Sequence, residues 1–452
     1  MGLRMSRAGA GERIPVYDVV GVGFGPSNLA LAIALTEHNA GEPVGGKVTA
    51  HFLERQPRFG WHRGMLIENA TMQVSFLKDL VTMRNPNSEF SFLTYLKAKG
   101  RLVDFINHKT LFPLRIEFHE YFEWAAAQVD DLVSYGSDVV AVRPVLVDDV
   151  VAYFDVDVRG DGETSVFRAR NLVIGTGLRP NLPEGVTPSD RVWHNHQLLH
   201  RVEELRESAP KRFMVVGAGQ SAAEVSALLH EQFPRAEVCA VFSRYGYSPS
   251  DDSSFANRIF DPEAVDQFYG SSDAVKAKLI DYHGNTNYSA VDIELIDDLY
   301  RRMYREKVQG VERLRLFNVS RPVDVVETAD GVRATIESLT TGERTVLEPD
   351  VVVYSTGYRP ADPTPLLGEL AAYCGRDQQG RLLVERDYRL KVEPAVSGGI
   401  YLQGGTEHSH GITSSLLSNT AVRVGEILES IVDRRDAAGS RPEYAVSGTT
   451  SA

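Results

Sequence analysis

Cysteine is scarce in this sequence. Of its 452 residues only Cys239 and Cys374 are cysteines, and no Cys-x-x-Cys pair occurs. A dithiol redox centre and a cysteine-ligated zinc site both need closely spaced thiols, so the sequence argues against either. We interpret the two cysteines as buried or incidental thiols.

Long apolar runs and an excess of positive charge are also missing. We find no run of about 18 apolar residues and no secretory signal, which predicts a cytoplasmic protein without a membrane partner. The formal net charge is −13 and no basic stripe balances it, which argues against nucleic-acid binding. With 43% hydrophobic residues, a chain of this length should form two or three domains with a large core.

Glycine, in contrast, is concentrated in two loops that each follow an apolar run. The first loop contains Gly21, Gly23, Gly25 and Pro26, and the second contains Gly217, Ala218, Gly219, Gln220 and Ser221. A strand, a glycine loop and a helix in succession bring backbone N–H groups and the helix N-terminus to a pyrophosphate. One such loop can be a plain glycine turn. Two in one chain indicate two dinucleotides, usually a nicotinamide that reduces a flavin.

The residue after the second strand of each unit indicates which nucleotide binds. Glu54 follows the apolar run 48–53 and could accept hydrogen bonds from an adenosine ribose, although it comes later than the usual spacing of about 20 residues. In the second unit the corresponding position is Arg244, which suits the 2′-phosphate of NADP. The alternative for Arg244 is a solvated surface cation.

Strand-like runs alternate with helical patterns along most of the chain, which predicts an α/β fold with two Rossmann-like dinucleotide-binding domains. Residues 251–306 lack strong strand signals and are expected to form a small, mostly helical insert. Residues 26–36 and 414–431 should be helices. The predicted divisions are 15–206 and 347–435 for the first domain, 207–250 and 307–346 for the second, and 436–452 for a loose tail like that of residues 1–14.

Four further segments are dense in polar and aromatic residues: MQVSFLKDL at 72–80, TNYS at 286–289, TEHSHG at 406–411 and SLLS at 415–418. At these residues the chain resembles the flavin-dependent N-hydroxylating monooxygenases of siderophore biosynthesis. Within that family it is most similar to the enzymes that act on L-ornithine, and the lysine-hydroxylating enzymes are close relatives. The resemblance covers about residues 16–432.

The resemblance implies a reaction and its partners. Such enzymes reduce FAD with NADPH and then react it with O₂, and the flavin C(4a)-hydroperoxide passes one oxygen to a side-chain amine. For L-ornithine the product is N(5)-hydroxyornithine, a precursor of hydroxamate siderophores or related natural products. The resemblance also suggests a homotetramer.

The resemblance further implies roles for individual residues. Lys78 would pair with the substrate carboxylate, and asparagines would hold the other polar groups because an amide both donates and accepts hydrogen bonds. Lys78, Asn257 and Asn287 form the implied catalytic set, with Arg258, Ile259, Phe260 and Ser418 as further substrate contacts. Besides the first loop, the implied FAD contacts are Glu54, Arg55, Trp61, His62, Gln73, Val139, Ser415, Leu416 and Leu417. Besides the second loop, the implied NADP contacts are Arg244, Asn287, Tyr288 and Ser289.

Several alternatives remain open from the sequence. Lys78 could be a surface lysine, Asn257 and Asn287 could be turn or capping residues, and Trp61 could be plain core. No metal site is predicted, and His408 and His410 should instead shape the loop over the flavin. Ornithine and lysine differ by one methylene, worth only ~1–3 kcal/mol in a pocket. A Baeyer–Villiger-type monooxygenase or a non-catalytic nucleotide sensor are more remote alternatives.

Overall fold

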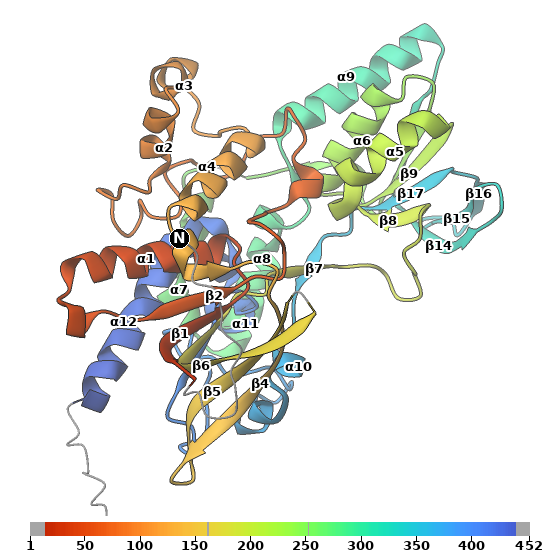
Figure 1. Ribbon diagram of the computed structural model, residues 1–452. Helices are drawn as coiled ribbons and strands as arrows, with labels where there is room; N and C mark the ends of the chain where they lie inside the picture. Colours follow the sequence, from red (N-terminus) through yellow and green to blue (C-terminus); the bar gives the residue numbers. More distant parts are fainter. Residues whose placement is uncertain (1–13, 161, 252, 440–452) are drawn as a thin grey trace, which may run out of the picture.

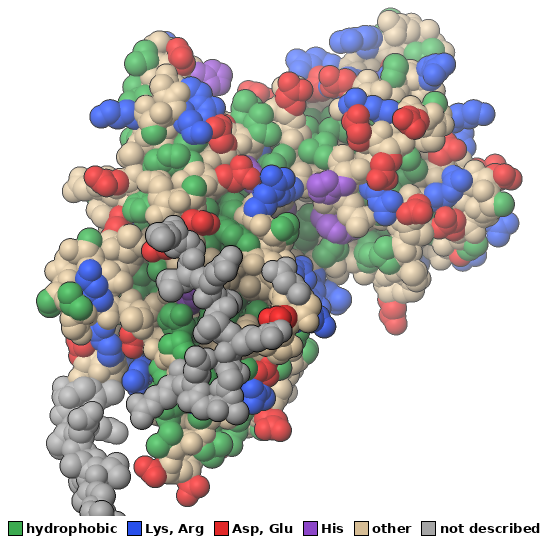
Figure 2. All heavy atoms as spheres, in the orientation of Figure 1, with side chains coloured by type: hydrophobic (Ala, Val, Ile, Leu, Met, Phe, Trp, Pro, Cys, Tyr) green, Lys and Arg blue, Asp and Glu red, His purple; other side chains and the backbone are tan. Residues whose placement is uncertain are grey.

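The computed structural model describes residues 14–160, 162–251 and 253–439 (Figure 1). The predicted tails therefore lie mostly outside the described residues. Residue 14 and residues 436–439 are the exceptions. Residues 436–439 continue the last helix, and the prediction of a tail there was wrong. Among the described helices, none is both long and apolar enough to cross a membrane. On the face shown in Figure 2, acidic and basic side chains are interspersed.

The first structural unit is built on a seven-stranded sheet. Strands β1, β2, β3, β6 and β19 are parallel, whereas β4 and β5 continue the sheet in antiparallel order. Their bounds are β1 Val16–Val22, β2 Ala50–Leu53, β3 Val133–Ser134, β4 Asp138–Val147, β5 Val150–Gly160, β6 Glu163–Ile174 and β19 Gly399–Leu402. Helices α1 (Pro26–Gly41) and α12 (Thr420–Gly439) pack against each other (Figure 1), and α1 is buried almost completely along its first three turns.

The second unit has a five-stranded parallel sheet in the order β13-β10-β9-β17-β8. Its strands are β8 Val192–His194, β9 Arg212–Val216, β10 Glu237–Val241, β13 Leu314–Phe317 and β17 Val351–Tyr354, and its helices are α5 Leu198–Ser208, α6 Gln220–Gln232 and α9 Ile293–Gln309. A separate antiparallel sheet comprises β14 Ser320–Glu327, β15 Val332–Ser338 and β16 Arg344–Leu347.

Strand pairing corrects two predicted domain boundaries. Strands β8 and β17 pair within the second sheet, although the predicted divisions 15–206 and 347–435 assigned both to the first unit. The reason is that a short apolar strand carries no local signal of which sheet it joins. The chain crosses between the units at an antiparallel pair of short strands, β7 (Leu178–Pro180) and β18 (Tyr358–Pro360).

The predicted insert 251–306 is mostly helical, but it serves both units. Helix α7 (Pro262–Tyr269) contacts α11 (Glu407–His410), and α8 (Asp273–Asn287) contacts the turn at Ile412–Ser415. In contrast, α9 packs on α6 of the second unit. Strands β11 (Ser248–Pro249) and β12 (Ala290–Val291) close the insert as a parallel pair.

Three helices follow the first two strands and form an aromatic cluster beside the first sheet. They are α2 Phe92–Ala98, α3 Leu102–His108 and α4 Arg115–Ala127. A further short helix, α10, spans Thr364–Leu367 and is not one of these three. Phe118, Tyr121 and Phe122 of α4 are buried against Phe92 and Tyr95 of α2 and against the first core. Trp61 packs against Phe122 of this cluster.

Helix ends agree with the predictions in part. Helix α1 begins at Pro26 as predicted, but it continues past the predicted end at residue 36 to Gly41. The predicted helix 414–431 begins only at Thr420, because residues 412–419 form two short 3-10 turns. Side-chain hydrogen bonds from Ser414 Oγ to the Gly411 carbonyl and from Thr413 Oγ1 to the Ile259 carbonyl favour these turns over a regular helix.

Candidate active site

The first glycine loop is shaped for a close approach to a ligand. A Cβ on Gly21 would lie 2.2 Å from Phe52, and one on Gly23 would lie 2.6 Å from the Gly175 carbonyl oxygen, at a φ of +82° that favours glycine. A Cβ on Gly25 would meet no heavy atom within 4 Å. Gly25 caps the N-terminus of α1, Pro26 is the first helical residue, and no acidic residue occupies the first turn. This helix end therefore fits a pyrophosphate.

Glu54 is held at the end of β2, directly beside this loop. Its buried carboxylate accepts hydrogen bonds from the backbone N–H groups of Phe24 (2.7 Å) and Gln56 (2.8 Å). The segment that leads to half-buried Val139 passes next to it, because Ser137 N–H donates to the Glu54 carbonyl. Arg55 is exposed. The structure thus brings Glu54 and Val139 into one neighbourhood, as an adenosine end would require.

Trp61 and His62 lie where the two units meet. Trp61 is half-buried and packs edge-to-face on Phe122 with ring centroids 5.4 Å apart, so a core role accounts for part of its surroundings. His62 has a left-handed backbone (φ +47°), and its ring lies 5.5 Å from that of Tyr358. The His62 side chain is accessible to solvent, but protein atoms surround it on most sides. The resulting desolvation, followed by the charges of Arg115 and His196, lowers its pKa to about 4.

The SLLS segment lies in the turns before α12. Ser415, Leu416 and Leu417 are half-buried, and Ser418 is buried. Ser415 Oγ is a buried oxygen without a hydrogen-bond partner among the described residues. An unsatisfied buried hydroxyl is costly, so this atom fits a polar ligand group such as the flavin edge. Gln73 is exposed.

Lys78 occupies a turn organised by the buried carboxylate of Asp79, which accepts hydrogen bonds from the backbone N–H groups of Val81, Thr82 and Phe92. Lys78 Nζ lies 5.8 Å from the centroid of the Phe260 ring. Across the described ranges, no carboxylate lies within 4 Å of Lys78 Nζ to form an ion pair. Burial lowers the Lys78 pKa, and the charge of Asp261 partly opposes this. The alternative of a solvated surface lysine does not fit this half-buried position.

The substrate residues of the insert converge on the same place. The turn Ala256–Phe260 contacts the turn Ile412–Ser415, and Thr413 Oγ1 donates to the Ile259 carbonyl. Asn257 is half-buried in this turn, whereas Arg258 is exposed and pairs with Asp261 at 3.4 Å. Lys78, Phe260 and the segment before Ser418 are therefore neighbours, although they are far apart in sequence.

The second glycine loop lies against the TNYS segment. A Cβ on Gly217 would lie 2.3 Å from the Ser355 carbonyl oxygen, and one on Gly219 would lie 3.3 Å from Ser289 Cα. Gly219 caps α6, whose first turn contains no acidic residue, and Ala218, Gln220 and Ser221 surround this helix end. Arg244 Nη1 donates to the Ser289 carbonyl at 3.3 Å. The arrangement fits a phosphate at the helix N-terminus with Arg244 to one side.

The TNYS segment contains two further predicted contact residues, Tyr288 and Asn287. Tyr288 Oη donates to Glu407 of the TEHSHG segment at 2.5 Å. Asn287 is the last residue of α8, but its side chain lies outside the described residues. His408 Nε2 donates to the Leu382 carbonyl (2.8 Å), and His410 stacks on Tyr388, so both histidines hold the loop in place.

Sequence reasoning missed two groups of residues at this site. Arg115 and Glu224 form a buried ion pair (2.7 Å) between the two units, and Arg423 lies fully buried below the SLLS segment. Only Arg423 left a sequence signal: it shares a helical face with the apolar residues Val424, Ile427 and Ile431 of α12, where a solvated arginine is not expected.

Comparison with known proteins agrees with this geometry. A family model described as L-lysine 6-monooxygenase/L-ornithine 5-monooxygenase matches residues 15–360. The L-ornithine N(5)-monooxygenase of Burkholderia cepacia is 40% identical over 95% of this chain and 97% of that protein. The ornithine N-hydroxylase of Kutzneria sp. 744, solved with reduced FAD, NADP⁺ and L-ornithine, superposes with a TM-score of 0.89 at 48% identity over 93% of this chain and 100% of that one.

A lysine-directed relative is also similar. The L-lysine 6-monooxygenase of Pseudomonas syringae superposes with a TM-score of 0.82 at 32% identity, over 92% of this chain and 99% of that one. The resemblance inferred from the polar segments is therefore confirmed, as is the fold with two dinucleotide-binding units. By sequence and by structure, the chain belongs to the family of L-lysine 6-monooxygenases and L-ornithine 5-monooxygenases.

Proposed function

We propose that this protein hydroxylates the side-chain amine of L-ornithine to N(5)-hydroxyornithine, with NADPH and O₂ as co-substrates and FAD as cofactor. The observation that carries the proposal is Lys78, a half-buried cation without an ion-pair partner among the described residues. It lies beside Phe260 of the Ala256–Phe260 turn, which in turn contacts the turn Ile412–Ser415. A cation in that position fits the carboxylate of an amino acid whose side chain extends toward the flavin.

The two glycine loops divide the cofactors between the units. The first loop, the α1 N-terminus and Glu54 bind FAD, with Ser415–Leu417 at its pyrimidine edge. When bound, FAD supplies the redox chemistry that accepts electrons from NADPH and activates O₂. The second loop, the α6 N-terminus and Arg244 bind NADPH, with Tyr288 and Ser289 along its ribose. The Arg244 guanidinium gives a preference for NADPH over NADH through the 2′-phosphate.

The protein must also favour the neutral form of the substrate amine, since only the free base attacks oxygen. An alkyl ammonium has a pKa near ~10.4 in water, and a water-poor pocket lowers it by disfavouring the charged form. The same burial already lowers the pKa of Lys78. Asn257, Asn287 and Ser418 complete the proposed cradle by hydrogen bonding to the amino acid without adding charge.

Ornithine is preferred over lysine because the Burkholderia and Kutzneria relatives act on ornithine and are more similar than the Pseudomonas syringae lysine enzyme. The test is hydroxylamine formation with NADPH from ornithine, lysine and putrescine in parallel. We expect product from ornithine, little from lysine, and little from putrescine, which lacks the carboxylate that Lys78 binds. Hydroxylation of lysine alone would establish the second candidate, an L-lysine N(6)-monooxygenase.

The product class indicates a role in hydroxamate siderophore or related natural-product biosynthesis. We further propose a cytoplasmic location, which two free, buried thiols support because they suit a reducing compartment. Fractionation of cells that express the full chain would test the location.

We also propose self-association, up to the homotetramer that the resemblance suggests. The outer face of α9 supports it with an apolar stripe of Ile293, Tyr300, Tyr304 and Val308, which are 57–71% exposed. The same face carries Asp297 toward its start and Arg305 toward its end, neither in an ion pair within the described chain. Two antiparallel copies of α9 would therefore place Asp297 of each opposite Arg305 of the other.

A charge swap tests this surface. Asp297→Arg or Arg305→Asp alone should lower the mass measured by sedimentation, and the double variant should restore it. Val103→Asp, at an exposed apolar position of α3, is the control and should leave the mass unchanged. A wild-type monomer, or singles with the wild-type mass, would contradict the α9 surface.

A further inference from the structure

Arg423 is the centre of a buried polar cluster that no role has yet explained. It is 1% exposed and lies on the inner face of α12. Its guanidinium donates to the Ser414 carbonyl, to Ser27 Oγ (3.0 Å), to Thr420 Oγ1 (3.2 Å) and to Gln403 Oε1 (3.3 Å). These partners come from the start of α1, the residue after β19, the turn before α12 and the first residue of α12.

The cluster continues without a break to the first glycine loop. Gln403 Nε2 donates to Asn28 Oδ1 at 2.9 Å, and Asn28 Nδ2 donates to the Gly23 carbonyl at 2.6 Å. Asn28 and Gln403 are both buried. One chain of hydrogen bonds therefore links the loop proposed to hold the pyrophosphate with the peptide between Ser414 and Ser415, where the proposed flavin segment begins.

The charge of Arg423 has no counter-ion in the described part of the chain. No carboxylate there lies within 4 Å of it, and the nearby Glu426 is already bound by both Nη atoms of Arg386 (2.7 and 2.8 Å). Burial lowers the Arg423 pKa, yet a guanidinium stays protonated in proteins. A buried cation without a counter-ion is costly, so negative charge on a ligand bound nearby would stabilise it.

We propose that Arg423 is a positioning residue that fixes the Ser414–Ser418 segment relative to the glycine loop. It also favours the reduced, anionic flavin over the oxidised one. The guanidinium places its positive charge against the Ser414 carbonyl, where the water-poor interior screens it little, so it favours negative charge at the neighbouring flavin edge. Reduction adds that negative charge to the pyrimidine edge of the flavin. The inference rests on the proposed FAD site.

The test measures the two-electron midpoint potential of the FAD-loaded protein and the affinity of the apoprotein for oxidised FAD. Arg423→Met removes the charge, so reduced FAD should bind at least roughly tenfold more weakly relative to oxidised FAD, a fall of about 30 mV in potential. Arg423→Lys keeps the charge but loses the planar guanidinium, whose three nitrogens donate separately to Ser414, Ser27 and Gln403. It should keep the wild-type potential but bind oxidised FAD several-fold more weakly.

The matched control is Arg434→Met, which removes an arginine of α12 itself that donates to the Ser397 carbonyl (2.7 Å) but lies outside the chain of hydrogen bonds. It should leave the potential unchanged. If Arg423→Met does not fold, Arg423→Gln carries the same expectation. A wild-type potential in the charge-free variant overturns the electrostatic role, and a wild-type FAD affinity in Arg423→Lys overturns the positioning role. A wild-type chain that binds no FAD would instead refute the proposed function.

Discussion

At the scale of single residues, Lys78 gives the most direct test of substrate binding. Lys78→Ala should raise the ornithine KM by roughly 10–100-fold, because a charge-assisted hydrogen bond contributes about 1.5–3 kcal/mol. The rate of flavin reduction by NADPH should change little, since Lys78 lies outside both glycine loops. Lys97→Ala, an exposed lysine on α2, is the control. An unchanged KM in Lys78→Ala would show that the carboxylate binds elsewhere.

His410 links a single buried residue to the acid stability of the protein. It is fully buried, stacks on Tyr388 (4.3 Å) and lies 3.1 Å from the Arg386 carbonyl, and its burial lowers the pKa to about 4. The unfolded value is about 6.5, so the unfolded chain binds more protons between these values. The contribution of His410 to stability is therefore full above about pH 6.5 and is lost as the pH falls toward 4.

Urea unfolding at pH 7 and pH 5 measures this effect. The wild type should lose stability between the two, and in His410→Gln this loss should be smaller by about 2 kcal/mol. His108→Gln, at an exposed position of α3, should show the wild-type loss. An equal loss in His410→Gln would mean that other groups cause the acid sensitivity.

The residues that sequence could and could not predict differ in how far their partners lie along the chain. The roles of Gly23 and Gly217 follow from a local strand, turn and helix, and the structure shows both at positive φ with no room for a Cβ. Lys78 was placed by resemblance, and its unpaired state required the structure. The apolar helical face around Arg423 indicates its burial, but its role could not be assigned from sequence, because its partner Ser27 lies nearly 400 residues earlier.

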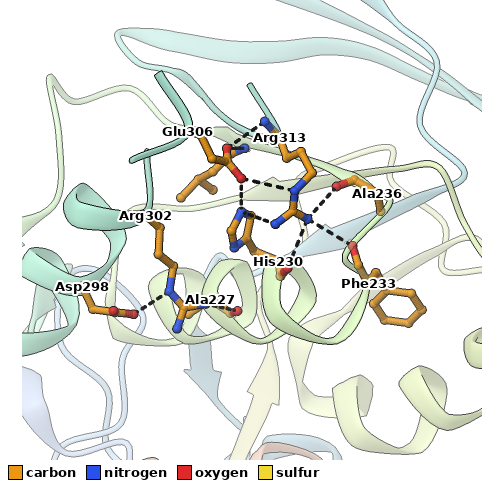
Figure 3. A network of polar contacts seen from close by, with 9 residues as sticks. Ala227, His230, Phe233, Ala236, Asp298, Arg302, Glu306 and Arg313 are labelled. Atoms are coloured by element: carbon orange, nitrogen blue, oxygen red, sulfur yellow. Dashed lines mark hydrogen bonds and ion pairs between the residues drawn. The ribbon is translucent and has the colours of Figure 1, made fainter. Parts of the chain in front are cut away.

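At the scale of elements, the network that ties α9 to α6 explains why the insert divides between the units (Figure 3). The buried Glu306 carboxylate accepts from His230 Nε2 (2.7 Å) and from the backbone N–H groups of Arg313 and Leu314. Arg313 Nη1 in turn donates to the carbonyls of His230, Phe233 and Ala236, which caps the end of α6. The end of α9, the end of α6 and the start of β13 are thus one polar cluster.

Removing the charge at the centre of this cluster should destabilise the second unit. Glu306→Gln leaves Arg313 half-buried without its ion pair, so we expect a loss of roughly 3–5 kcal/mol in the free energy of unfolding. Asp298→Asn, which breaks the more exposed pair with Arg302 on the same helix, should cost under about 1 kcal/mol. Chemical denaturation of the two variants would separate them, and equal effects would show that the cluster is not central to stability.

The elements that sequence predicted are those with strong local patterns. Helix α1 begins at Pro26 because proline suits a first turn, and the apolar runs before both loops are strands. The start of α12 was missed because hydrogen bonds of Thr413 and Ser414 to distant or preceding carbonyls decide it. The sheet of β17 was missed because strand order depends on contacts that a short apolar run does not encode.

At the scale of the whole molecule, the two units meet at a contact that sequence did not predict. Arg115 of α4 forms a two-pronged pair with Glu224 of α6 (2.7 and 3.0 Å), and also donates to the Met65 carbonyl. Next to it, Gly64 packs so closely that a Cβ would lie 1.8 Å from the His196 carbonyl oxygen. Glu224 also accepts from Gln220 of the second glycine loop at 2.9 Å, so this contact sets where the loop lies relative to the first unit.

The orientation of the units should therefore depend on this pair, and with it the delivery of hydride from NADPH to the flavin. Arg115→Met leaves Glu224 buried and unpaired, which should cost roughly 3–5 kcal/mol of stability and slow flavin reduction, while oxidised FAD binds as before. Arg115→Met combined with Glu224→Met removes both charges and should recover most of the stability but not the reduction rate. A double-mutant cycle of unfolding and reduction kinetics measures both couplings. Stability and reduction rate that recover together would mean that the pair only holds the fold, whereas recovery of stability alone would show that it orients the nicotinamide unit for hydride transfer.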